Sequence, residues 1–142
     1  MIRFARFVWE LPQNLLGMAN LVLQRSMGNV RQIEREDGRV MVELRGDGAV
    51  SLGWFVFHSR HDGHFVPVGA ENRQHERGHS VQSRWLGPLY LPLVGVPSVL
   101  RVLYAMTYRA RHGRRWPHYY DGWPERSADQ LGHVDRALRP AP

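Results

Sequence analysis

The chain has 142 residues, a formal net charge of +6 and no cysteine. This length suits one compact domain, so we expect residues 1–142 to share a single core. Without cysteine, a disulfide framework, a thiolate metal site and a thiol nucleophile are excluded, so any metal must bind His, Asp or Glu. All nineteen basic residues are arginine and they lie scattered along the chain, so we do not expect a nucleic-acid partner.

The N-terminal segment predicts one or two short amphipathic helices. Apolar side chains recur at helical spacing from Phe4 to Gln24, and Pro12 marks a break or a kink. Polar residues such as Glu10 and Asn14 interrupt the apolar stretch. We therefore do not expect a cleaved signal peptide.

Short apolar and β-branched runs follow between Val30 and Phe57, separated by residues that form turns. This pattern predicts strands at Val40–Leu44 and Val50–Phe57 in a small antiparallel sheet. The stretch His58–Ala70 is rich in His, Gly and Asp and predicts a loop.

The next segment, Glu71–Trp85, lacks proline and predicts a helix that carries His75-Glu76-Arg77-Gly78-His79. Two histidines four residues apart lie on one face of a helix and can present two imidazoles to one tetrahedral zinc ion. Glu76 lies beside them, where its carboxylate can act as a general base toward a metal-activated water. Chance yields this pattern in about 2% of chains of this composition, so an incidental motif is the weaker interpretation.

Residues 86–106 form an almost wholly apolar segment in which Arg101 is the only charge. The segment is long enough to cross a hydrocarbon layer, and the arginines after it favour a cytoplasmic flank. Its prolines also fit a re-entrant or interfacial segment, or a buried hairpin that covers the active site. We expect association with the cytoplasmic face of a membrane, and otherwise a cytoplasmic protein. Ser98 is the expected N-cap of a helix that ends near Arg111.

A last short helix is predicted at Glu125–Leu131. Other residues near it that can bind a metal are His118, Asp121 and His133, which stay open as alternative ligands. The metzincin pattern is excluded, because it needs Gly and His where this chain has Gln82 and Trp85.

HExxH followed by Glu125, Ala128 and Asp129 resembles the HExxH and ExxAD motifs of gluzincin zinc metallopeptidases, in particular the HtpX-like membrane zinc endopeptidases. The same motif, His75-Glu76-Arg77-Gly78-His79, followed by the run from Gln82 to Leu91 also resembles small uncharacterised bacterial membrane-associated proteins, and this second resemblance covers most of the chain. The resemblance implies an α+β, zincin-like minigluzincin with an HExxH helix and a C-terminal helix that supplies the third ligand. By this resemblance Glu125 is that ligand, and Asp129 orients a ligating histidine.

These residues lead us to expect a zinc-dependent peptidase that acts on a peptide or protein. His75, His79 and Glu125 would hold zinc, and Glu76 would be the catalytic base. Candidate donors to the developing oxyanion are Tyr119, Tyr120 and His118. An extended substrate could add to the strand before the motif helix.

The chain is much shorter than the better-known peptidases and lacks their several transmembrane helices. Two other interpretations therefore stay open. One is a non-catalytic basic module that binds a membrane surface or nucleic acid, with an incidental or structural HExxH motif. The other is a zinc site that has been retained without peptidase activity.

Overall fold

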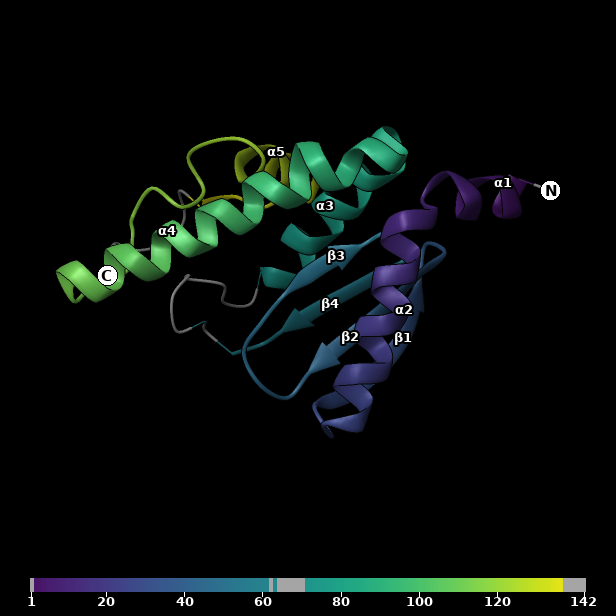
Figure 1. Cartoon of the computed structure of the whole chain (residues 1–142), viewed down its shortest axis with the longest axis horizontal. Coiled ribbons are helices and arrows are strands. Elements are labelled where there is room, and N and C mark those ends of the chain that lie inside the picture. Colours follow the sequence, from purple (N-terminus) through teal and green to yellow (C-terminus); the bar gives the residue numbers. More distant parts are fainter. Residues whose placement is uncertain (1, 62, 64–70, 137–142) are drawn as a thin grey trace.

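The computed structural model describes residues 2–61, 63 and 71–136 and has an α+β fold. Figure 1 shows a sheet with helix α2 packed across its near face and helix α3 beyond it. The helices and strands are, in chain order, α1 Ile2–Trp9, α2 Leu11–Ser26, β1 Val30–Glu36, β2 Arg39–Leu44, β3 Val50–Leu52, β4 Phe55–Ser59, α3 Asn72–Leu86, α4 Val96–His112 and α5 Glu125–Leu131. Between α3 and α4 lie a 3₁₀ turn, Gly87–Leu89, and a π-helical turn, Leu91–Gly95.

The sheet is mixed, so the prediction of an antiparallel sheet was wrong. Its strand order is β1-β2-β4-β3, in which the central pair β2 and β4 is parallel and both outer pairs are antiparallel. The chain passes from β2 to the far edge, forms β3 there, and turns back to place β4 in the centre. Strand β3 is therefore the edge strand nearest the helices that follow.

The predicted strand Val50–Phe57 is two strands joined by a tight turn at Gly53, whose φ of +60° suits glycine. Strand β1 was not predicted, because its residues are mostly exposed and charged and leave no apolar run. Of the predicted loop His58–Ala70, the first two residues belong to β4, and residues 62 and 64–70 lie outside the described part of the chain.

The two faces of the sheet are both covered. Val42, Leu44 and Phe57 form a buried cluster on one face, and Leu21 of α2 packs against it. Side chains at alternate positions, such as Met41 and Val56, point to the other face, where α3 contacts the sheet. The motif helix α3 is therefore fixed against a rigid support.

The predicted break near Pro12 is confirmed, because α1 ends at Trp9 and α2 begins at Leu11. The break turns Glu10 into the protein interior. Its carboxylate accepts hydrogen bonds from Arg39 on β2, at 3.0 Å, and from the hydroxyl of Ser83 on α3, at 2.6 Å. This buried ion pair ties the N-terminal helices, the sheet and the motif helix together.

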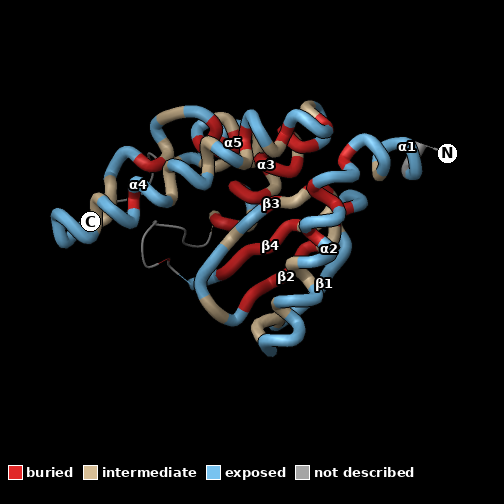
Figure 2. Tube along the Cα trace, viewed as in Figure 1, coloured by how far each residue is buried: buried red, intermediate tan, exposed pale blue. Residues whose placement is uncertain are grey.

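Helix α4 continues directly from the π-helical turn, so Ser98 lies inside the helix and is not its N-cap as predicted. The combined helical stretch Leu91–His112 is long and apolar enough to cross a membrane by length and composition alone, and only 11% of its most apolar part is buried. Figure 2 shows that α2 and α4 expose most of their outward surface.

Candidate metal centre

Close packing of α5 against α3 builds the site. A Cβ atom at Gly78 would lie 1.8 Å from the carbonyl oxygen of Ala128, and one at Gly132 would lie 2.1 Å from the carbonyl oxygen of Gln74. Only glycine allows the two backbones to approach so closely. As a result, Glu125, the first residue of α5, lies over the histidines of α3.

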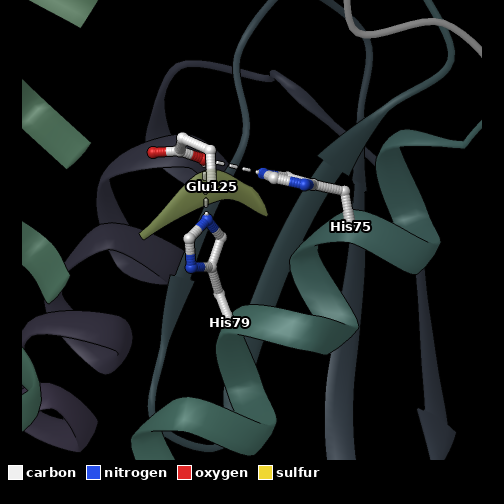
Figure 3. A group of neighbouring side chains, drawn as sticks. All are labelled: His75, His79 and Glu125. Carbon is white, nitrogen blue, oxygen red and sulfur yellow. Dashed lines mark hydrogen bonds and ion pairs between the residues drawn. The ribbon is translucent and has the colours of Figure 1, made fainter. Parts of the chain in front are cut away.

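The three side chains His75, His79 and Glu125 are buried and converge on one point (Figure 3). Glu125 Oε2 lies 3.0 Å from His75 Nε2 and 3.1 Å from His79 Nε2. Three ligand atoms of these residues lie within 4.8 Å of one another, so the group could hold a metal ion. Two of the alternative ligands, His118 and Asp121, instead pair with each other on the surface.

The Nδ1 atoms of both histidines are held by oxygen acceptors. Asp129 Oδ1 lies 2.7 Å from His75 Nδ1, and Gln82 Oε1 lies 2.8 Å from His79 Nδ1. A carboxylate or amide oxygen accepts hydrogen bonds and does not donate them, so each Nδ1 carries a hydrogen. Each Nε2 is then the nitrogen available to a metal. In most metal sites the other ring nitrogen of a ligating histidine donates a hydrogen bond in this way.

The electrostatics of the group favour a cation at its centre. Burial opposes protonation of His75, but its hydrogen bonds to Asp129 and Glu125 outweigh this and raise its pKa to about 9. Burial likewise opposes the charge on Glu125, but hydrogen bonds from His75 and His79 hold its pKa well below the usual range. Converging lone pairs are stable only with a positive charge between them, and either a proton or a metal ion can supply it.

Glu76 is buried beside this group, and burial raises its pKa. Its Oε2 atom has no hydrogen-bond partner among the described residues. A buried carboxylate oxygen without a protein partner is costly unless water or another ligand satisfies it. The atom belongs to a residue that lines a cleft, so a molecule bound there could supply the partner.

This cleft has a volume of about 710 Å³ and lies along the edge strand β3. The triad and Glu76 form one part of its wall, Val50–Leu52 another, and α4 and Leu16 of α2 much of the rest. Apart from the triad and Glu76, most side chains that line the cleft are apolar or aromatic. The cleft therefore joins a polar, chargeable group to an apolar binding surface.

Of the three candidate oxyanion donors, Tyr119 and Tyr120 line the cleft. The Tyr120 ring packs edge-on against His75, with 5.2 Å between the ring centroids. Burial raises the pKa of both tyrosines, so both hydroxyls stay protonated at neutral pH. His118 is 69% exposed in its side chain and is not among the residues that line the cleft.

Three supporting residues were not predicted from the sequence. Gln82 follows His79 by three positions on the same helix, a spacing that could have revealed it. Ser98 of α4 donates a hydrogen bond of 2.6 Å to Glu125 Oε1. Arg136 pairs with Asp129 through two nitrogens and lies over the Tyr120 ring. The contact of Ser98 joins distant segments, and Arg136 lies beyond the end of α5, so neither contact leaves a helical pattern in the sequence.

Comparisons with protein-family models, with curated proteins and with solved structures found no match. The functional argument therefore rests on the chemistry of the site.

Proposed function

We propose that this protein is a zinc-dependent peptidase of the gluzincin type. His75, His79 and Glu125 would hold the metal, and Glu76 would act as the general base. The observation that carries the proposal is the convergence of three ligand atoms, two of them on imidazoles whose other nitrogens are held by Asp129 and Gln82.

The donor set fits zinc. Two imidazole nitrogens and one carboxylate oxygen are typical of catalytic zinc sites, in which three protein ligands leave a fourth position open. Ligand atoms around a tetrahedral zinc lie about 3.3 Å apart, and the contacts of Glu125 Oε2 with the two histidines, 3.0 and 3.1 Å, are close to this spacing. All three ligand atoms lie within 4.8 Å of one another, so side-chain movement could close the set around the ion.

When bound, zinc would supply a Lewis acid that activates water and polarises a carbonyl oxygen. Glu76 can accept a proton from that water, and its raised pKa suits a group that must later return the proton to the leaving amine. Asp129 and Gln82 keep the histidines in the required orientation, and Ser98 holds Glu125. The protonated hydroxyls of Tyr119 and Tyr120 are the nearest candidates to stabilise an oxyanion.

A peptide substrate is supported by the position of the cleft beside an edge strand, where an extended chain can pair with a sheet. Strand β3 has only three residues, and the carbonyl of Ser51 at its centre already accepts a hydrogen bond from Tyr90. We therefore expect few backbone pairs with β3, and binding that depends mainly on apolar side chains in the cleft.

Zinc stoichiometry tests the proposal first. We expect one zinc per chain after metal stripping and reconstitution, measured by elemental analysis, and loss of most of it in His79→Ala and Glu125→Ala. His112→Ala is a matched control, because this histidine is exposed at the end of α4 and does not belong to the group that could hold a metal. Absence of zinc in the wild type would overturn the proposal.

Activity is tested with quenched fluorescent peptides rich in apolar residues. Glu76→Gln should keep its zinc and lose cleavage by about a hundredfold or more, because it removes the base and leaves the ligands in place. A zinc-loaded wild type that cleaves none of these peptides would favour a zinc site retained without peptidase activity. Strongly salt-dependent binding of the zinc-free protein to nucleic acid would favour the basic binding module.

A further inference from the structure

The exposed side chains of α2 and α4 form an apolar face. On α2, Val22 is 69% exposed and Leu23 is 54% exposed. On α4, a stripe at helical spacing consists of Val96, Val99, Leu103 and Met106. Exposed apolar surface on this scale normally marks a site of interaction.

The two helices belong to the same side of the molecule. Leu16 of α2 and Leu100 and Leu103 of α4 line the same cleft, and each of the three is about half exposed. Figure 1 agrees, since α2 passes in front of the sheet and α4 passes in front of α3 and α5. The cleft therefore lies between the two halves of the apolar face.

The charged residues on the two helices are all basic, and, outside the candidate metal centre, the acidic Asp47 lines the cleft between them. Neither α2 nor the stretch Leu91–His112 contains an acidic residue. Arg25 lies at the end of α2, and the exposed Arg111 and Arg114 lie at the end of α4. An apolar surface fringed by arginine complements an anionic lipid bilayer, with the apolar side chains among the acyl chains and the guanidinium groups among the headgroups.

The contacts of Arg101 decide between lying on the bilayer and crossing it. From the middle of α4, its guanidinium donates hydrogen bonds to the carbonyls of His118 and Tyr119 and lies over the Trp116 ring. The segment held along α4 in this way carries the exposed His118 and Asp121, whose side chains are 69% and 66% exposed. A spanning α4 would draw these polar groups into the hydrocarbon, where they would lack water.

We propose that the apolar face of α2 and α4 docks on the surface of an anionic phospholipid bilayer, with both helices in the interfacial plane and neither spanning it. This proposal is independent of metal binding. If the proposed peptidase function also holds, the cleft opens on the membrane side, and its substrates are apolar peptide segments at the bilayer surface.

Vesicle flotation with the full chain tests the proposal, using phosphatidylcholine vesicles with and without about 30% phosphatidylglycerol. We expect the zinc-loaded and zinc-free proteins to float with the anionic vesicles, to bind less to neutral vesicles, and to be released by alkaline carbonate. About 1 M salt should weaken binding, because it shortens the screening length to about 3 Å.

Val22→Glu on α2 and Met106→Glu on α4 should each weaken vesicle binding by about tenfold or more. Both residues are exposed and neither lines the cleft, so both variants should keep the circular dichroism spectrum of the wild type. Gln32→Glu on β1 adds the same charge at an exposed polar position and should bind vesicles like the wild type.

Four results would overturn the proposal. Equal vesicle binding by all variants would show that the apolar face is not the docking surface. Absence of vesicle binding by the wild type would show that the protein does not dock on these bilayers. Resistance to carbonate extraction would show a spanning helix. A dimer in the ultracentrifuge that Val22→Glu dissociates, together with no binding to vesicles, would show that a second copy of the chain covers the face.

Discussion

Gln82 and Asp129 determine which nitrogen each histidine turns toward the shared point. Both residues lie on helices that also carry ligands, so the orientation of each imidazole is fixed by the packing of the same helices. Ser98 and Arg136 extend this support to Glu125 and to Asp129. The candidate site is therefore a set of ligands whose directions are set by a second layer of hydrogen bonds.

The Gln82 contact can be tested by substitution. Gln82→Met keeps the length of the side chain but removes the acceptor for His79 Nδ1, so we expect the zinc affinity to fall by about 10–100-fold. Competition with a chromogenic chelator measures this affinity. Gln74→Met makes the same change at an exposed position of α3 and should leave the affinity unchanged.

His58, on β4, is not part of the candidate metal site. Its environment predicts that the stability of the protein depends on pH. Burial, followed by the charge of Arg73, lowers its pKa from 6.5. Because the folded state favours the neutral imidazole, this contribution to stability is present above pH 6.5 and is lost as the pH falls through the folded pKa.

Urea unfolding between about pH 7 and pH 5 measures this effect. We expect the free energy of unfolding to decrease less with falling pH in His58→Gln than in the wild type. Parallel curves for His58→Gln and the wild type would contradict the assignment.

At the scale of helices and strands, the contact between α3 and α5 brings Glu125, the third candidate ligand, to the two histidines. The glycines at this contact have no space for a side chain, and Ala128 opposite Gly78 is fully buried. The buried pair of Glu10 and Arg39 fixes the other end of α3 through Ser83. Close backbone contacts with α5 and the hydrogen bond from Ser83 to Glu10 therefore both fix the position of the motif helix.

Gly78→Ala tests this contact. The added Cβ would meet the backbone of Ala128, so α5 must move away, and we expect a loss of about 1–3 kcal/mol in stability together with weaker zinc binding. Chemical denaturation and zinc titration measure the two effects. Gly95→Ala is the matched control. The nearest atom to its added Cβ would lie 3.6 Å away, which is ordinary van der Waals contact, so we expect this substitution to be tolerated.

For the whole molecule, a metal bound between α3 and α5 would link two segments about fifty residues apart in the chain. A ligand that binds only the folded state stabilises it, by about 4 kcal/mol when its free concentration is about 1,000 times the dissociation constant. We therefore expect zinc to raise the melting temperature in calorimetry and a chelator to reverse the change. Glu125→Ala should show neither effect, and an unchanged response to zinc in that variant would place the metal elsewhere.

Together, α2 and α4 make one side of the molecule apolar, and neither helix does so alone. The buried sheet lies behind α2, and the cleft opens between α2 and the edge strand on one side and α4 on the other. Metal chemistry and lipid binding are thus proposed for adjacent surfaces of one small protein, and the two sets of variants test them separately.

The sequence by itself determined the local features of this protein. The proline-free stretch Glu71–Trp85 predicted the motif helix, and helical spacing placed His75 and His79 on one face of it. The last short helix was predicted at Glu125–Leu131, and Pro12 marked the break between α1 and α2. These features depend on contacts between neighbours in the chain, so they leave a periodic or positional pattern that can be read directly.

Only the tertiary structure decided how these parts meet. The parallel pairing of β2 with β4 and the hydrogen bond from the Ser98 hydroxyl to Glu125 join residues that are distant in the chain. The guanidinium of Arg136 reaches Asp129 from beyond the end of α5, outside any helical repeat. Such contacts arise when packing brings whole helices and strands together, and each residue involved is compatible with many other partners. The sequence could therefore name the candidate ligands, Glu125 through the resemblance, while the packing of α5 and α4 around α3 determined their geometry and support.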